Sequence, residues 1–531
     1  MSCPIFDINY FDQDQARAFV LAALDRLATT EKYRHLSASL KAHRKVYASA
    51  ADSLVAGLES VAAEDGAKFS GYAPVLEAVA TALAEVANPG TINDEVQASL
   101  EGAVLETLAD RILVREAHKL RDQLPANIPS ETKEKLYLKE EQLARLASVV
   151  YQMPAPPLPM FLSQEFASAY GIAINGLLPN HPFLDGRGRQ PSGAVFSAVI
   201  NAHALFGSDP AVAAIAVQHA GSGPHTPNPF LIDFYLKAAR DKSAARTSEE
   251  LIVSPEHIVA LYESVRSRVP AGAISRLNIS GAEDSDLADV EITIEDMTGP
   301  PRVIAFQTSQ AGVLYFGRGI GNVFVDAPDM DVKIGSGNSI ELRAPISLNI
   351  ARLEFNCPEL VVSRREQDAS LDDNAVVIEA RELSRSNITG VPTVRKGVEL
   401  FVAWPNSHQH PWNVYPLVQS HADDQDLGFM RRRLRKILTA FRRDKKAGFV
   451  RYAPKIQHLR MTKGERGGYL VDCLVRDQVL SLFDGGKYYR LDPVVMGRLL
   501  GMDWNTLMKY RFTDQCDDYL RSIAAEFRAT Q

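Results

Sequence analysis

A dense block of cationic side chains near the carboxyl end is the strongest chemical feature of this sequence. Between Arg431 and Arg466 the chain holds fourteen Lys and Arg and only two acids, Asp444 and Glu465, which is a net charge of +12. Removing +12 from the total charge of −7 leaves −19 for the remainder of the chain. Such a block attracts and orients polyanions, so the partner we expect is a nucleic acid or an acidic protein surface.

The start of this block combines cations with an apolar stripe at helical spacing. Leu434, Ile437, Leu438 and Phe441 fall on one side of a predicted helix. We expect these four residues to anchor the helix to a core, while the cations make contacts with the phosphate backbone or with partner acids. The predicted contact residues are Arg431, Arg432, Arg433, Arg435, Lys436, Arg442, Arg443, Lys445 and Lys446.

A structural interpretation competes with binding. The helix could pair with the protein's own acids, and Asp423, Asp424 and Asp426 directly precede it. Surface ion pairs contribute only about 0.3 to 0.5 kcal/mol each. Seven cations on one helix are more than surface pairing with the protein's own acids would require. The sequence therefore favours contact with phosphates.

Carboxylates around a predicted strand could instead hold a metal ion. Asp372 and Asp373 precede the apolar residues 376–378, and Glu379 and Arg381 follow them. Asp373 and Glu379 could bind Mg²⁺, which would polarise a phosphodiester. The pattern loosely resembles the acid, acid-x-Lys pattern of metal-dependent nucleases. Arg381 stands at the Lys position, however, and Arg cannot accept a proton at neutral pH; an outward strand face explains the same residues.

Two histidines in a predicted loop form a weaker candidate metal site. His408 and His410 could chelate a metal if a strand placed both imidazoles on one side, but no third ligand lies nearby. The competing interpretation is a polar loop anchored by Trp404 and Trp412. We therefore expect no metal and no cofactor.

Signatures of nucleotide-dependent and hydrolytic enzymes are missing from the sequence. No G-x-x-x-x-G-K-[ST] and no G-x-S-x-G occurs. The glycine-rich residues 317–321 are followed by a strand-like segment rather than a helix, which predicts a β-turn. No catalytic residue is therefore predicted outside the candidate group Asp373, Glu379 and Arg381.

The bulk composition is typical of a globular, intracellular protein. A chain of 531 residues with 46% apolar content predicts roughly three or four domains. The sequence has no long apolar run and no cationic leader, so we expect no membrane helix and no signal peptide. The four cysteines are isolated, which favours a reducing, cytoplasmic setting.

Changes of hydrophobic period divide the chain. Helical spacing dominates residues 1–152 and predicts a bundle, with one apolar stripe at Val20, Ala23, Leu24 and Leu27. Prolines at 154–159 mark a boundary. Residues 160–270 combine three predicted helices, over 193–206, 229–245 and 255–269, with long loops. Residues 271–405 change to period two and predict short strands, one of which ends at Ala344-Pro345. Solenoid and sandwich both fit this β-rich domain.

The last domain, residues 425–531, carries the one fold-level resemblance. A predicted helix over 469–475 is followed by strands at 479–483 and 487–491, joined by a turn at Asp484-Gly485-Gly486. Helices followed by such a hairpin resemble a winged-helix module. The helix before the hairpin contains both acids and arginines. The resemblance therefore implies contacts with the phosphate backbone or with a protein rather than base readout.

These observations predict a multidomain α+β protein. Its expected function is that of a non-enzymatic scaffold or regulatory subunit in a multiprotein complex, binding nucleic acid or an acidic partner through the basic C-terminal module. One alternative is a metal-dependent, nuclease-like hydrolase using Asp373 and Glu379. The other is a purely protein-binding component of a larger complex.

Overall fold

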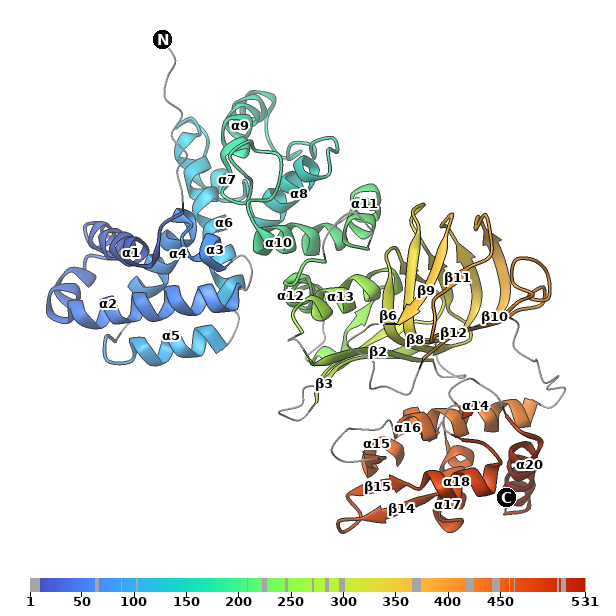
Figure 1. Ribbon diagram of the computed structural model, residues 1–531. Helices are drawn as coiled ribbons and strands as arrows, with labels where there is room; N and C mark the ends of the chain where they lie inside the picture. The colour runs from blue at the N-terminus through green and yellow to red at the C-terminus, as the bar shows by residue number, and fades with distance from the viewer. Residues whose placement is uncertain are drawn as a thin grey trace. The chain divides into compact units, whose positions relative to one another are not determined.

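Figure 1 shows the computed structural model of the chain, coloured from the N-terminus to the C-terminus. The chain divides into two compact units. Unit 1 comprises Met1–Ala220, Pro227–Ala244 and Glu263–Ser267, and unit 2 comprises Gly221–Thr226, Ala245–Tyr262 and Arg268–Gln531. The structure describes residues 10–62, 66–86, 88–101, 104–207, 209–221, 227–243, 247–269, 272–281, 286–295, 301–364, 374–415, 425–441, 449–457, 459–462, 464–503, 506–507 and 512–530.

Unit 1 is built from helices. They are α1 (Gln13–Leu27), α2 (Leu36–Val61), α3 (Gly66–Ser70), α4 (Ala73–Ala84), α5 (Ile92–Glu101), α6 (Val104–Gln123), α7 (Ser130–Glu134), α8 (Lys139–Val150), α9 (Gln164–Leu177), the 3-10 helix η2 (Leu178–Asn180), α10 (Ala194–Leu205), α11 (Pro210–Gly221) and α12 (Leu231–Lys242). Helix α13 (Pro255–Ser267) contributes residues to both units.

The apolar stripe predicted from the sequence faces the interior of unit 1. Val20, Ala23 and Leu24 of α1 are buried, and Leu27 is partly buried. Three helices predicted from the sequence are found as α10, α12 and α13, whereas α9 and α11 were not predicted. No described helix is long and apolar enough to cross a membrane.

Unit 2 contains a large, curled, mixed sheet, drawn mainly in yellow in Figure 1. The 3-10 helix η3 (Ser248–Glu250) precedes its first strand. The strands are β1 (Ile252–Val253), β2 (Ile274–Gly281), β3 (Leu287–Glu295), β4 (Arg302–Ser309), β5 (Val313–Phe316), β6 (Ile320–Ala327), β7 (Asp331–Ile334), β8 (Ile340–Phe355), β9 (Leu360–Arg364), β10 (Ala375–Ser386), β11 (Thr393–Val394) and β12 (Glu399–Ala403).

The sheet has an antiparallel part and a parallel part. Strands β2, β3 and β4 pair antiparallel. Strands β2, β6, β8, β10 and β12 then pair in parallel, each with the next. The shorter strands β5, β7, β9 and β11 join at the side of this path, and all four also pair in parallel.

The parallel register lines up one row of polar residues. Ser280 of β2 pairs with Asp326 of β6, Asp326 with Asn349 of β8, and Asn349 with Glu379 of β10. Side chains alternate between the two faces of a strand, so residues in register share a face. We call Ser280, Asp326, Asn349 and Glu379 the polar ladder.

The C-terminal part of unit 2 has its own core and a small sheet. Its helices are α14 (Gln425–Thr439), α15 (Ala453–Gln457), α16 (Leu459–Thr462), α17 (Glu465–Arg476), α18 (Pro493–Leu500) and α20 (Asp514–Thr530), and its strands are β13 (Val450–Tyr452), β14 (Leu480–Phe483) and β15 (Tyr488–Leu491). The strands pair antiparallel in the order β13-β15-β14. The helix and hairpin predicted from the sequence are thus present, with α17 beginning four residues earlier than predicted, at Glu465.

Candidate functional site

Helix α14 presents its apolar side to the core of the C-terminal part. Leu434, Ile437, Leu438 and Phe441 are fully buried in one cluster with residues of α17 and α20. The predicted anchoring role of these four residues is therefore confirmed. Their burial fixes the rotation of α14 and, with it, the directions in which the cations of the same helix leave the backbone.

The cationic side of α14 meets the polar ladder of the sheet. The Nη2 atom of Arg433 donates to Oδ2 of Asp326 at 3.1 Å, and Nζ of Lys436 lies 3.7 Å from the same oxygen. The other carboxylate oxygen of Asp326 accepts a hydrogen bond from Nδ2 of Asn349 at 3.0 Å. Asp326 is therefore held by its neighbour on the sheet and directed at two cations of the helix.

Two further bonds extend this contact over neighbouring strands. Nη1 of Arg435 donates to Oγ of Ser347 on β8 at 3.0 Å, and Nζ of Lys436 donates to Oγ of Ser280 on β2. The cations of α14 therefore reach β2, β6 and β8, which are adjacent in the sheet. We call Arg433, Arg435 and Lys436, together with their partners Asp326, Ser280 and Ser347, the α14 docking site.

Arg431 points away from the docking site, into the C-terminal core. Its Nε donates to Oδ1 of Asp517 at 2.7 Å, and its Nη2 donates to the other oxygen of that carboxylate. Each side chain of the pair is only 9% exposed. The guanidinium also lies 5.4 Å from the ring centroid of Phe512. Arg431 therefore joins α14 to α20.

Two of the predicted contact residues, Arg431 and Arg433, are buried rather than accessible to a partner. They are 7% and 1% exposed, because acids that are remote in the sequence lie against them in the fold. Arg432, Arg435 and Lys436 are partly exposed. The remaining predicted contact residues, Arg442, Arg443, Lys445 and Lys446, lie outside the described residues.

Two later cations of the basic block also pair with acids. Nη1 of Arg466 donates to Oδ1 of Asp426 at 2.9 Å, and this bond, together with the positive charge, lowers the pKa of Asp426. The Nη2 atom of Arg451 lies 4.0 Å from Oε1 of Glu295 on β3. The Asp426 pairing agrees with the structural interpretation of this block, in which nearby acids neutralise the cations.

The structure gives Glu379 a place in the polar ladder. Its Cα partner on β8 is Asn349, whereas Asp373 lies outside the described residues. Arg381 is exposed and pairs with Asp329 at 3.0 Å. No group of three or more potential metal ligands is found among the residues that the structure describes.

The two loop histidines are exposed, and the tryptophans beside them are buried. His408 and His410 follow β12 in a turn. Trp404 and Trp412 are 1% and 3% exposed, and their ring centroids lie 5.0 Å apart in an edge-to-face arrangement. This geometry agrees with the interpretation of the segment as a polar loop anchored by its tryptophans.

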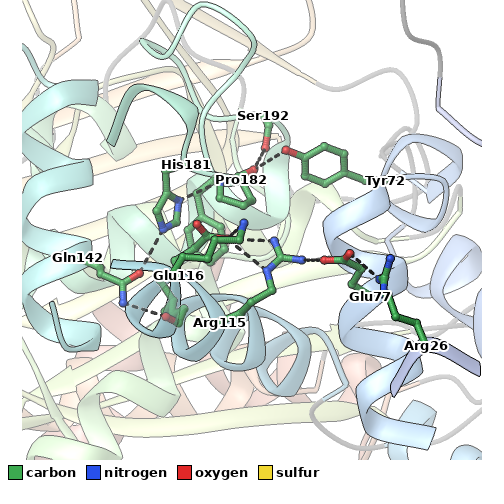
Figure 2. A network of polar contacts seen from close by, with 12 residues as sticks. Arg26, Tyr72, Glu77, Arg115, Glu116, Gln142, His181, Pro182 and Ser192 are labelled. Atoms are coloured by element: carbon green, nitrogen blue, oxygen red, sulfur yellow. Dashed lines mark hydrogen bonds and ion pairs between the residues drawn. The ribbon is translucent and has the colours of Figure 1, made fainter. Parts of the chain in front are cut away.

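Unit 1 holds a polar network that the sequence did not reveal. Figure 2 shows Arg115 of α6 between Glu77 of α4 and Glu116 of α6. Glu77 also accepts a hydrogen bond from Arg26 of α1 at 3.0 Å, and Lys119 donates to Glu116 at 2.8 Å. Only the Glu116 and Lys119 pair, three residues apart on one helix, has a spacing from which it could have been predicted.

His181 lies at the buried end of the same region. Its Nδ1 accepts from the backbone N–H of Phe183 at 3.1 Å, so its Nε2 carries the proton and donates to Oε1 of Gln142 at 3.2 Å. Burial, reinforced by the charges of Arg115 and Lys119, lowers the pKa of His181 to about 3. His181 is therefore a neutral structural residue at physiological pH.

The comparisons with known proteins give no further guide to this site. Nothing among family models, curated proteins and solved structures matches the chain.

Proposed function

We propose that the chain is a non-enzymatic scaffold or regulatory subunit whose residues 425–531 bind an acidic protein surface through the cationic face of α14. The observation that supports this proposal is the convergence of Arg433 and Lys436 on Asp326, at 3.1 and 3.7 Å. In the free protein, Asp326 occupies this face. A partner that offers several carboxylates would displace Asp326 and take its place.

The spacing of the docking site favours a protein partner over a nucleic acid. The cations of α14 reach oxygens on three adjacent strands, and neighbouring strands lie about 4.8 Å apart. Acidic side chains on a partner's sheet or helix can offer oxygens at such a spacing. Arginine also suits this role because its planar guanidinium binds carboxylates through two parallel hydrogen bonds.

Backbone-type binding of nucleic acid is the second candidate, and the charge of the basic block favours it. A net charge of +12 between Arg431 and Arg466 would give strong, salt-dependent attraction to phosphates. The winged-helix resemblance also supports it, since the β14–β15 hairpin follows α17 and a third strand, β13, pairs with β15. Arg476 of α17 pairs with Glu526 and Asp477, which argues against base readout by this helix.

The sheet would supply the rigid part of such a scaffold. Parallel pairing of β6, β8, β10 and β12 in chain order is the pairing expected of stacked coils, so it supports the solenoid interpretation over a sandwich of antiparallel sheets. We propose a cytoplasmic multiprotein complex as its setting. The hydrolase alternative gains no support from the described residues, which do not include Asp373 and hold no group of three or more potential metal ligands.

A single isosteric substitution tests the proposal. Asp326→Asn removes the internal acid while keeping the side-chain volume and the bond from Asn349. We expect the full chain carrying Asp326→Asn to bind a poly-glutamate peptide several-fold more tightly than the parent protein, since the cations no longer have to leave an internal partner. Affinity is measured by fluorescence anisotropy with a labelled peptide at two salt concentrations.

A matched control and a competing probe sharpen the result. Asp329→Asn makes the same change in the loop after β6, on an exposed acid that pairs with Arg381, and we expect it to leave binding unchanged. If the folded Asp326→Asn variant binds the peptide no more tightly than the parent protein, Asp326 does not compete with a partner for these cations. A duplex DNA that binds more tightly than the peptide, with a steep salt dependence, would favour the second candidate.

A further inference from the structure

A proline-rich segment, residues 154–159, joins α8 to α9 in unit 1. Its sequence is Pro-Ala-Pro-Pro-Leu-Pro, and it belongs to neither a helix nor a strand. The proline ring fixes φ at about −65°, and a residue that precedes a proline is restricted to extended conformations. Every residue of this segment is a proline or precedes one, so the segment favours the polyproline II helix. We call residues 154–159 the proline segment.

Hydrogen bonds hold the proline segment at both ends. The backbone N–H of Met153 donates to the carbonyl oxygen of Ser148 in α8 at 2.8 Å. At the other end, the N–H of Leu162 donates to the carbonyl oxygen of Pro159 at 3.2 Å. Ser163 then caps the start of α9 through its side chain. The segment is thus fixed both where the chain leaves α8 and where it enters α9.

One side of the proline segment packs onto unit 1. Nη1 of Arg145, a buried residue of α8, donates to the carbonyl oxygen of Pro156 at 3.3 Å. Leu158 packs against a buried apolar cluster that includes Tyr170 of α9. Pro156, Leu158 and Pro159 are accordingly half-buried. The middle of the segment is therefore anchored as well as its ends.

Another edge of the proline segment is open to solvent. A polyproline II helix has about three residues per turn, so Pro154 and Pro157 lie on one edge, and both are exposed. Met160, directly after the segment, is 100% exposed, and Phe161 is 58% exposed. Proteins that bind polyproline II helices read such an edge with grooves lined by aromatic side chains. The segment therefore offers the spacing and the chemistry that such a groove recognises.

The charges on either side of the segment narrow the class of partner. No Lys or Arg occurs between Arg145 and Arg187 in the sequence, and the guanidinium of Arg145 is bound to Glu141. The first charge after the segment is that of Glu165, which is exposed. A groove whose own acids require a flanking cation finds none here and meets an acid instead. An aromatic groove without such acids fits.

We propose that the proline segment is a docking site for a protein with an aromatic-lined groove of the WW-domain kind, whose rings pack against Pro154 and Pro157. Because the segment meets its partner already ordered, binding costs less conformational entropy than it would for a free chain. This site lies in unit 1. Its partner is therefore distinct from the acidic surface proposed for α14, and either site can be tested without the other.

A WW domain that binds the isolated segment serves as the probe. A synthetic peptide of residues 151–163 selects such a domain from a panel of purified WW domains, and titration calorimetry then measures its affinity for the full chain. We expect the full chain to bind the selected domain at least as tightly as the peptide does, because the exposed edge is already formed. An SH3 domain that requires a flanking arginine is expected to bind neither.

Substitutions separate docking from the structural role of the prolines. The double substitution Pro154→Ala and Pro157→Ala removes both exposed rings and keeps the anchored side of the segment. We expect it to lower the affinity for the WW domain about tenfold or more. Pro125→Ala, which removes an exposed proline ring in the turn after α6, should leave the affinity unchanged.

Three results would overturn the proposal. The first is a panel in which no WW domain binds the peptide. The second is a selected domain that binds the peptide but not the folded full chain, since the edge would then be inaccessible in the protein. The third is unchanged affinity of the folded double variant, which would show that the exposed rings make no contact with the partner.

Discussion

Arg431 of α14 and Asp517 of α20 form a two-pronged ion pair whose side chains are each only 9% exposed. The residues are 86 positions apart in the sequence, yet the pair lies within a core of apolar residues from both helices. A charge in such a place is stable only while its partner remains. This pair therefore ties the start of the basic block to the last helix of the chain.

Removing one member of this pair should be costly. We expect Asp517→Ala to lower the free energy of unfolding of the C-terminal part by about 3 to 5 kcal/mol, because it leaves the charge of Arg431 buried and unpaired. Hydrogen exchange of peptides from α14 and α20 in the full chain measures the loss. Replacing both residues by Leu should recover most of it.

A neighbouring exposed pair provides the control for this measurement. Asp518 of α20 pairs with Arg521, and the two side chains are 75% and 54% exposed. Asp518→Ala should change stability by less than about 1 kcal/mol. Equal effects of the Asp517 and Asp518 substitutions would show that burial does not set the strength of the first pair.

Local patterns in the sequence predicted the elements of unit 2 but not their partners. The period of two over residues 271–405 correctly indicated strands, and in β7 and at the start of β8 the buried residues alternate, as at Val332, Ile334, Ile340 and Leu342. The alternation of apolar and polar residues is visible within the sequence of one strand. The pairing of that strand depends on which distant segment of the chain lies beside it. The acids that meet Arg431 and Arg433 are 86 and 107 residues away, so no local spacing could have shown that these cations are buried.

The strand predicted to end at Ala344-Pro345 shows a different kind of error. Strand β8 continues through both residues. Ala344 pairs with Arg364 of β9, and Ile346 pairs with Val376 of β10 and with Val323 of β6. Pro345 lies where β8 changes partners and where the register with β6 shifts. Proline, which has no backbone N–H, is tolerated where the backbone hydrogen bonds between strands are interrupted. The sequence alone does not reveal where such an interruption lies.

His181 should make the stability of unit 1 depend on pH. The unfolded chain binds a proton on this imidazole below the ordinary pKa of 6.5, but burial lowers the pKa in the folded protein to about 3. Between these values the unfolded state binds more protons, so the free energy of unfolding falls as pH falls. The slope from this one group is at most about 1.4 kcal/mol per pH unit.

Substitution of His181 separates its share of this slope from that of other groups. In urea unfolding between pH 7 and pH 5, we expect His181→Asn to be less stable than the parent at pH 7 but to lose less stability on acidification. The same substitution at exposed His408 should leave the slope unchanged. An identical slope for the parent and His181→Asn would contradict the buried, neutral state of this imidazole.

Two adjacent glycines of α17 should respond in opposite ways to the same added methyl group. A Cβ at Gly467 would lie 1.6 Å from the backbone oxygen of Thr462, whereas a Cβ at Gly468 would meet no atom within 4 Å. Gly467→Ala must therefore move α17 away from α16, and we expect it to destabilise the C-terminal part by about 1 to 3 kcal/mol. Gly468→Ala should stabilise it by about 0.5 to 1 kcal/mol, because alanine favours the helix. Thermal unfolding followed by circular dichroism compares the two variants, and a stabilising Gly467→Ala would show that these helices are not packed as closely as the backbone contact requires.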